Sequence, residues 1–115
     1  GASGPEIETI GDVQFAAQII PGLDPKELRG LLAQARSNMG SGIAAAAAVN
    51  DSGVAFAVSV TDDLVGRFNA GDLLRAAVTV VGGKGGGKPD MAQGGGPAGA
   101  DAGAAMDAVR AAIAG

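Results

Sequence analysis

One glycine-rich segment near the carboxyl end holds the residues of this chain that are best suited to chemistry. Nine of the eighteen residues from Gly82 to Gly99 are glycine, and Lys84 and Lys88 stand among them. Glycine lets a backbone approach an anion closely and turn its amides toward it, and lysine adds positive charge. We therefore expect the segment to bind a phosphate group or a sugar-phosphate backbone. A flexible linker is the alternative interpretation of such a composition.

Two known phosphate-binding motifs almost fit this segment. Residues 82–88 have the spacing of the Walker loop, but Pro89 stands where that motif needs Ser or Thr for magnesium. Residues 94–99 have the spacing GxGxxG, but no strand of a dinucleotide-binding unit precedes them. The sequence therefore predicts neither a nucleoside-triphosphatase loop nor a dinucleotide site.

The candidate phosphate-binding residues are lysines, glycines and a glutamine of this segment, together with two arginines that precede it. The arginines are included because the chain from Thr61 to Gly82 leads directly into the segment. Solvated helix charges are an equally good interpretation of both arginines. The full set is Lys84, Gly85, Gly86, Gly87, Lys88, Gln93, Gly94, Gly95, Arg67 and Arg75.

The amino-acid composition excludes several classes of function. The chain of 115 residues has no His, Cys, Trp or Tyr. Triads that use imidazole, thiolate nucleophiles, disulfides and the usual Cys/His zinc sites are therefore excluded. The adjacent acids Asp62 and Asp63 fit a helix cap better than a metal site, because neighbouring side chains in a first turn point apart. We expect no catalytic residue, metal ion or cofactor in this chain.

The charge balance restricts the partners. Eight Lys and Arg residues stand against twelve Asp and Glu residues, so the formal net charge is -4. Such a chain has no general attraction for nucleic acid, and binding needs a local cationic patch. The longest uncharged apolar run, residues 43–50, is far shorter than the ~20 residues that span a bilayer, and the N-terminus has no basic segment ahead of an apolar stretch. We expect a soluble protein without a membrane partner.

The first half of the chain begins with a strand and a helix. Residues 13–20 alternate polar and apolar side chains and are predicted to form a strand. Asp24 and the proline that follows it predict a helix that runs to Met39 and stops at Gly40.

A hairpin follows that helix. Residues 43–50 contain five consecutive alanines, whose intrinsic propensity favours helix. We nevertheless predict a strand, because the turn sequence at residues 50–53 joins this run to a clear strand at residues 54–61.

The second half contains a short turn up to residue 68, a helix that begins at Asn69, a glycine loop at residues 82–99 and a last helix over residues 100–114. The order β-α-β-β-α-glycine loop-α predicts an α/β fold with a small mixed sheet in a single compact domain. We place this domain at residues 12–115 and interpret residues 1–11 as a tag or linker remnant.

The glycine segment resembles a known signature. Residues 80–95 are similar to the glycine-rich signature near the carboxyl end of bacterial alanyl-tRNA synthetases. Leu28-Arg29-Gly30, the hairpin between Ile43 and Val60, and residues 69–73 are also similar to that family. The resemblance covers about residues 12 to 114. It identifies the chain as a globular C-Ala domain, related to the domain that accompanies DHH-type phosphoesterases.

The resemblance implies a non-catalytic function. A C-Ala domain is expected to contact the outer corner of alanine-specific tRNA and to help couple aminoacylation with editing. The catalytic domains of the parent ligase would be its other partners, in the cytoplasm. Related phosphoesterase domains usually carry His after the triple glycine, where this chain has Lys88. This difference favours binding over turnover, because lysine contacts phosphate as a point charge.

Two alternatives remain open at this stage. The chain could instead be the phosphate-clamping substrate domain of a DHH-type nucleic-acid phosphoesterase. It could also be an oligomerisation module whose alanine-rich faces pack against another copy, and self-association is left undecided by the sequence.

Overall fold

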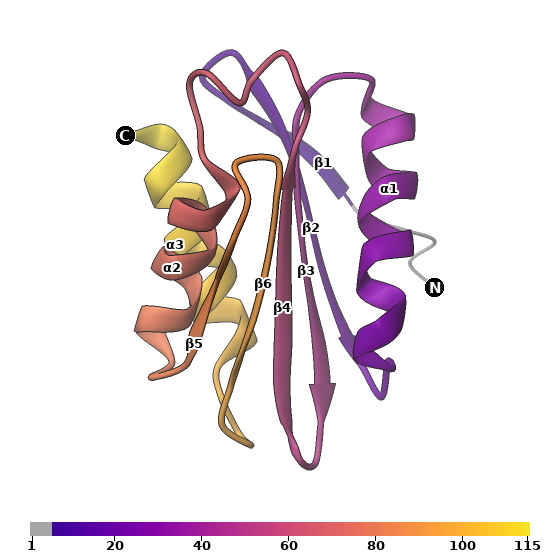
Figure 1. Cartoon of the computed structure of the whole chain (residues 1–115), viewed down its shortest axis with the longest axis vertical. Helices are drawn as coiled ribbons and strands as arrows, with labels where there is room; N and C mark the ends of the chain where they lie inside the picture. The colour runs from indigo at the N-terminus through magenta and orange to yellow at the C-terminus, as the bar shows by residue number, and fades with distance from the viewer. Residues whose placement is uncertain (1–5) are drawn as a thin grey trace.

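The computed structural model describes residues 6–115 and folds them into a six-stranded sheet with helices on both faces (Figure 1). In chain order, the elements are β1 Glu6–Ile10, β2 Val13–Pro21, the 3₁₀ turn η1 Pro25–Glu27, α1 Leu28–Met39, β3 Ile43–Asn50, β4 Gly53–Val60, α2 Ala70–Val80, β5 Lys84–Gly87, β6 Met91–Gly96 and α3 Ala102–Ala114. The strands lie in the order β1-β2-β3-β4-β6-β5. The β2–β3 pair is parallel and every other neighbouring pair is antiparallel. The predicted α/β class and mixed sheet in a single compact domain are confirmed.

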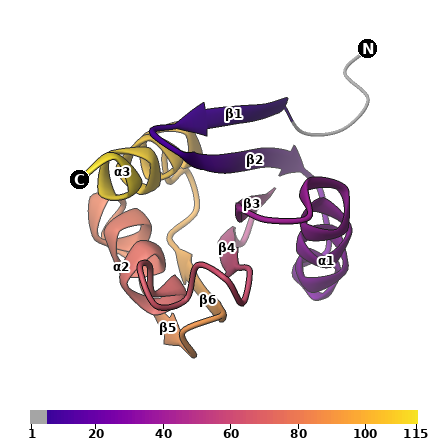
Figure 2. The same cartoon turned by 90° about the horizontal axis from the view of Figure 1, so that it is seen from above.

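The sheet separates two layers of helices. Helix α1 lies on one face, and helices α2 and α3 lie on the other (Figure 2). Strand β3 is buried on both faces: its alanines at 44, 46 and 48 pack toward α1, and those at 45 and 47 pack toward α2 and α3. Pairing with β2 and β4 on either side overrides the helical propensity of the alanine run. The predicted strand is therefore confirmed.

Both predicted helix starts are confirmed with their capping side chains. The Asp24 carboxylate accepts a hydrogen bond from the Lys26 amide at 3.0 Å, and the chain passes through η1 before α1 begins. At α2, the side-chain oxygen of Asn69 accepts from the amides of Gly71 and Asp72. These bonds satisfy amides that have no partner within the helix.

Strand β1 lies within residues 1–11, the stretch that we interpreted as a tag or linker remnant ahead of a domain that begins at residue 12. Residues 6–10 pair antiparallel with β2, and Ile10 packs against the core. A two-residue turn, Gly11–Asp12, joins the strands, with Gly11 at φ +65°. Tight hairpins favour glycine at this position, so the Gly-Asp pair is the sequence signal for β1. Residues 1–5 lie outside the described residues.

The expectation of a glycine loop at residues 82–99 is wrong, because most of this segment forms a hairpin of the sheet. Strand β6 pairs with β4 on one side and with β5 on the other, and β5 forms the edge of the sheet. The turn between them is closed by the amide of Lys88, which donates to the carbonyl of Met91 at 2.9 Å. The flexible-linker interpretation is therefore wrong for β5 and β6.

Glycine is required on the hairpin face that meets α2. A Cβ atom added at Gly85 would lie 2.8 Å from the Leu74 Cδ2 atom and 2.6 Å from the Gly94 Cα atom. Real Cβ contacts are longer than this, so neighbouring atoms would have to shift. Within α2, a Cβ atom added at Gly71 would lie 3.4 Å from the carbonyl oxygen of Gly87. Helix α2 therefore rests directly on the main chain of the hairpin.

The opposite face of the hairpin is open. Side chains alternate along a strand, so Lys84, Gly86 and Lys88 share the face on which α1 lies. A Cβ atom added at Gly86 would meet no atom within 4 Å. Helix α1 packs over β3 and β4 and leaves this part of the sheet uncovered.

The two faces predict opposite effects for neighbouring glycines. We expect Gly85→Ala to destabilise the domain by about 1–3 kcal/mol, because its methyl group would overlap backbone and Leu74. The matched control Gly86→Ala should be neutral or stabilising, because its methyl group points into open space. Urea unfolding measures both free energies. Equal effects of the two substitutions would contradict the packing of α2 on the hairpin.

Candidate functional site

A groove runs between α1 and the open face of the glycine hairpin. Its volume is about 530 Å³. One wall comes from α1, and the other wall and the floor come from β5, β6 and the turn that joins them. The lining residues are Arg29, Ala33, Arg36, Gly86, Gly87, Lys88, Asp90, Met91 and Gln93.

The groove contains only part of the predicted phosphate-binding set. Of that set, Gly86, Gly87, Lys88 and Gln93 line it. Lys84 stands at the other end of β5 from Lys88, about 13 Å away along an extended strand. Lys84 and Lys88 therefore share one face but do not meet at one point. Gly85 and Gly94 face α2, where they serve packing, and Gly95 does not line the groove.

The α1 wall was not predicted as part of the site. Arg29, Ala33 and Arg36 are four and three residues apart, so they lie on one stripe of the helix, beside the buried stripe of Leu28, Leu32 and Ala35. That spacing is visible in the sequence. The sequence does not show that β5 and β6 lie opposite this stripe, because residues 82–99 were expected to form a loop.

Arg67 and Arg75 lie outside the groove. The Arg67 guanidinium forms two hydrogen bonds with the Asp12 carboxylate, at 2.9 and 3.0 Å, which lower the pKa of Asp12 and raise that of Arg67. Arg75 pairs with Asp72 on the exposed surface of α2 at 3.0 Å. Both arginines thus have acidic partners, in agreement with the interpretation that they are solvated charges.

The cations that form ion pairs lie in other elements than those that form none within residues 6–115. On α3, Arg110 pairs with Glu8 and with Asp107, and these hydrogen bonds raise its pKa. Together with Arg67 and Arg75, it accounts for every ion pair found among residues 6–115. The remaining cations lie in or next to three elements. Lys26 is in η1, Arg29 and Arg36 are in α1, Lys84 begins β5 and Lys88 follows it.

This distribution gives an acidic chain a local cationic surface. Three of the cations without an ion pair, Arg29, Arg36 and Lys88, line the groove, and Asp90 is the one acid among the lining residues. Amides, guanidinium groups and ammonium groups are the donors that bind phosphate in proteins. The groove is therefore suited to a phosphate group or an RNA backbone.

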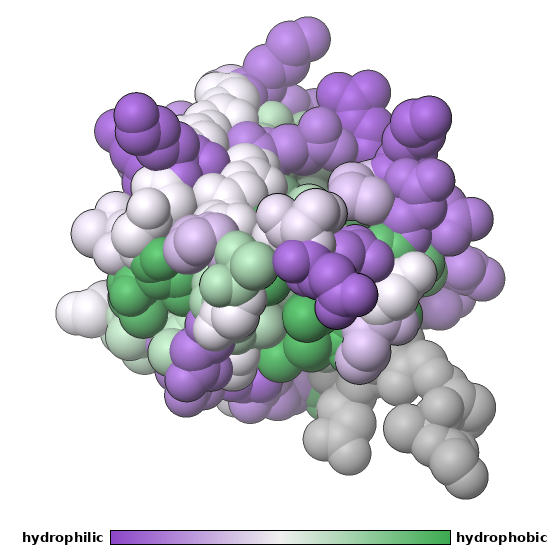
Figure 3. Space-filling model, turned by 90° about the horizontal axis from the view of Figure 1, so that it is seen from below, coloured by the Kyte–Doolittle hydropathy of each residue, from purple (hydrophilic) through white to green (hydrophobic). Residues whose placement is uncertain are grey.

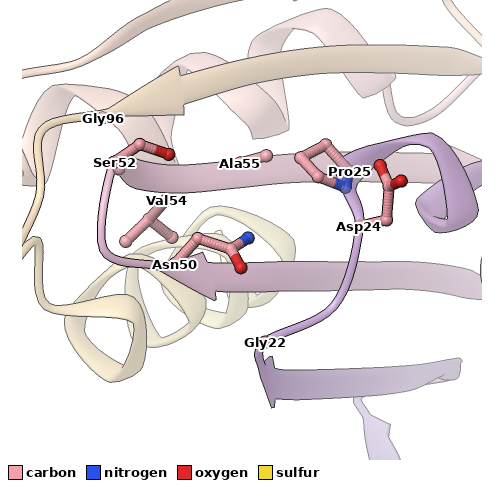
Figure 4. Close-up of a pocket in the computed structure, with 9 residues that line it drawn as sticks. Gly22, Asp24, Pro25, Asn50, Ser52, Val54, Ala55 and Gly96 are labelled. Atoms are coloured by element: carbon pink, nitrogen blue, oxygen red, sulfur yellow. The ribbon is translucent and has the colours of Figure 1, made fainter.

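A second hollow lies at the opposite end of the sheet and has a different character. It has a volume of about 510 Å³ and is formed by the β3–β4 turn, the start of the helical segment and the end of β6 (Figure 4). Its polar side chains serve the fold: Asp24 caps η1, and the Asn50 amide donates to the Leu23 carbonyl at 2.8 Å. Because it contains an acid and no cation, it is unsuited to phosphate.

The surface around this hollow also bears on self-association. Seen from this end, apolar residues form separate patches among polar ones (Figure 3). The large exposed apolar side chains, Ile7, Ile19 and Val80, come from three different elements. The five alanines of β3, which are part of the alanine-rich faces in the oligomerisation alternative, are buried inside the chain's own core. Singly exposed apolar residues are ordinary on monomeric proteins.

Of the adjacent acids Asp62 and Asp63, Asp63 has a structural role. The Asp63 carboxylate accepts hydrogen bonds from the hydroxyls of Ser41 and Thr61, which lower the pKa of Asp63.

Within residues 6–115, no group of three or more acidic side chains is placed to hold a metal ion. None of the helices in that range is long and apolar enough to cross a membrane.

Comparison with known sequences identifies the family. Residues 12–115 match the DHHA1 domain. The chain belongs to the DHHA1 domain family. The domain is 54% identical over 114 residues to an alanine-tRNA ligase of Sphingopyxis alaskensis and 52% identical to that of Rhizorhabdus wittichii. Each match covers 98% of this chain and 13% of the relative, so the DHHA1 domain spans a small part of the proteins that it resembles.

Solved structures agree with this assignment. The DHHA1 domain is similar to the C-Ala domain of Aquifex aeolicus alanyl-tRNA synthetase, with a TM-score of 0.87, 26% identity and coverage of 96% of this chain and 99% of that chain. A DHH-domain protein described as a member of the s1p family of ribosomal proteins is similar with a TM-score of 0.62, 12% identity and coverage of 96% and 28%. The second likeness concerns the fold alone. The resemblance to C-Ala stated from the sequence is thus confirmed.

The hydrogen bonds of Asp63 predict a pH-dependent stability. A depressed folded-state pKa means that the carboxylate stabilises the fold above its unfolded pKa of about 3.9 and that this contribution is lost as the pH falls through the lower folded pKa. Asp63→Asn should therefore lower the unfolding midpoint at pH 7, and the difference from the original chain should vanish in acid. The exposed neighbour Asp62 makes no side-chain hydrogen bond within residues 6–115, so Asp62→Asn is the matched control. A constant difference across the pH range would contradict this assignment.

Proposed function

We propose that this DHHA1 domain is the tRNA-binding C-Ala module of an alanyl-tRNA synthetase. In this role it contacts the outer corner of alanine-specific tRNA and helps bring one tRNA to both the aminoacylation and the editing centres. The chemistry takes place in other domains of the parent ligase, in the cytoplasm, and this domain contributes binding without catalysis. Its partners are tRNA and those domains.

One observation carries the proposal: the groove combines the glycine hairpin of a DHHA1 domain with cations that form no ion pair in the described part of the chain. The similarity to alanine-tRNA ligases over nearly the whole chain supports tRNA as the source of the phosphate. The side chains available suit a backbone reader. The chain has three Phe and no Trp or Tyr, and Phe15 and Phe56 are fully buried, so it lacks the aromatic platform that single-strand binders use.

The expected binding is modest in strength and depends on salt. A domain of net charge -4 with a few phosphate contacts should bind tRNA with micromolar or weaker affinity. Contacts of this kind release counterions, so the affinity should fall steeply as the salt concentration rises.

Lys88 provides the direct test. We expect Lys88→Ala to weaken tRNA binding and to reduce the slope of log K against log salt by about one unit, because one phosphate contact is lost. Arg110→Gln removes the same charge from the opposite layer, where Arg110 is held by Glu8 and Asp107, and should leave both quantities unchanged. Fluorescence anisotropy with labelled tRNA measures affinity and slope. Equal losses in the two variants, or no loss in either, would remove the groove from the proposed function.

A further inference from the structure

Arg36 is the most unusual side chain of the groove. Its Nε atom is the one buried side-chain nitrogen or oxygen within residues 6–115 that has no hydrogen-bond partner. A guanidinium group has five N–H donors and cannot lose its charge in a protein. Burying such a donor without an acceptor is unfavourable, so native structures rarely leave one. We therefore expect a ligand to supply the acceptor for this N–H group.

The surroundings of Arg36 contain acceptors but no ion-pair partner. On one side is the groove with Lys88, Gln93 and Asp90. On the other side is a hollow of about 580 Å³ that Arg36 shares with Thr61, Asp62 and Asp63. No carboxylate in the described part of the chain lies within 4.0 Å of the Arg36 guanidinium, and Asp63 is already engaged by Ser41 and Thr61.

The groove has the size and composition for an anion between two walls. Its volume of about 530 Å³ lies within the range of ~300–1,000 Å³ in which proteins bind small ligands and cofactors. Arg36 and Arg29 stand on the α1 wall, and Lys88 stands on the hairpin wall. Between the two arginines, the wall carries only the small side chain of Ala33.

We propose that α1 supplies half of a phosphate-binding cleft, in which Arg36, assisted by Arg29, holds a phosphate group against Lys88. The sequence placed its candidate phosphate-binding residues in the glycine segment and at Arg67 and Arg75, whereas the geometry adds α1, which contributed none of them. The identity of the phosphate rests on the proposed function: it is a phosphodiester of the RNA backbone. The planar guanidinium of Arg36 can donate two parallel hydrogen bonds to one phosphate, which a lysine cannot do.

The Nε–H group of Arg36 can be observed directly. In nitrogen-15 NMR spectra, the arginine Nε–H signals are separate from the backbone signals, and Arg110 provides an internal reference because its Nε already bonds to Glu8. We would titrate the 115-residue chain with alanine-specific tRNA and, separately, with inorganic phosphate. The Arg36 signal should shift on titration while the Arg110 signal stays in place.

Two substitutions complete the test. Arg36→Gln should reduce the affinity for tRNA about tenfold or more, because a hydrogen bond to a charged group is lost. Arg36→Lys keeps the charge but loses the two-pronged donor, so it should restore only part of the affinity. Unfolding midpoints of both variants show whether the fold is retained. Since the buried Nε has no partner within residues 6–115, neither substitution should lower the midpoint appreciably.

The outcomes separate this inference from the proposed function. If tRNA binds and the Arg36 signal and affinity respond as expected, both stand. If tRNA binds equally well to the original chain and to Arg36→Gln, and the Arg36 signal does not move, the cleft is wrong and the proposed function remains. If tRNA fails to bind but inorganic phosphate shifts the Arg36 signal, the phosphate cleft stands and the tRNA role falls. If neither titrant shifts the signal, the cleft is overturned.

Discussion

The close contact between α2 and the glycine hairpin is the constraint on which the rest of this structure depends. Gly85, Gly87 and Gly94 present main chain where other residues would present side chains, so the helix lies directly on the sheet. That contact fixes β5 and β6 as an extension of β4. Because α1 covers only the earlier strands, the extension has one covered face and one open face. The groove therefore exists because glycine builds the hairpin.

Charge distribution supplies the second requirement. The chain carries more acids than cations, and a uniform distribution would repel RNA. Arg67 pairs with Asp12 of the β1–β2 turn, Arg75 with Asp72 on α2, and Arg110 with Glu8 of β1, so these three cations are neutralised. The cations on the α1 side have no such partners within residues 6–115, and three of them line one groove. Ion pairs at exposed sites add little stability, so we attribute to these pairs a role in confining free positive charge to a single face.

The local signals in the sequence predicted several elements well. Asp24 and Asn69 marked helix starts because a side-chain oxygen is needed to satisfy free amides. The alanine run at residues 44–48 was predicted correctly from its turn, against its propensity. The hairpin of β5 and β6 was not predicted, because glycine has low strand propensity and its role there depends on a helix that packs from outside. Because the hairpin was not predicted, no feature of the sequence placed Arg29 and Arg36 opposite it, and the α1 wall of the groove was not predicted either.

The central claim is that residues 84–96 are an ordered part of the sheet that presents an open face to a ligand. Backbone amide hydrogen exchange of the 115-residue chain, without ligand, tests it most directly. Every β6 amide points at β4 or β5, so protection of β6 should approach that of β3 and β4. In β5, successive amides point alternately toward β6 and away from it, and the hydrogen bond from the Lys88 amide to the Met91 carbonyl fixes which ones point away. The amides of Gly85 and Gly87 point away from β6, so they should exchange faster than the amide of Gly86. Unprotected exchange throughout residues 84–96 would mean that the segment is a tether, and the groove would lose its second wall.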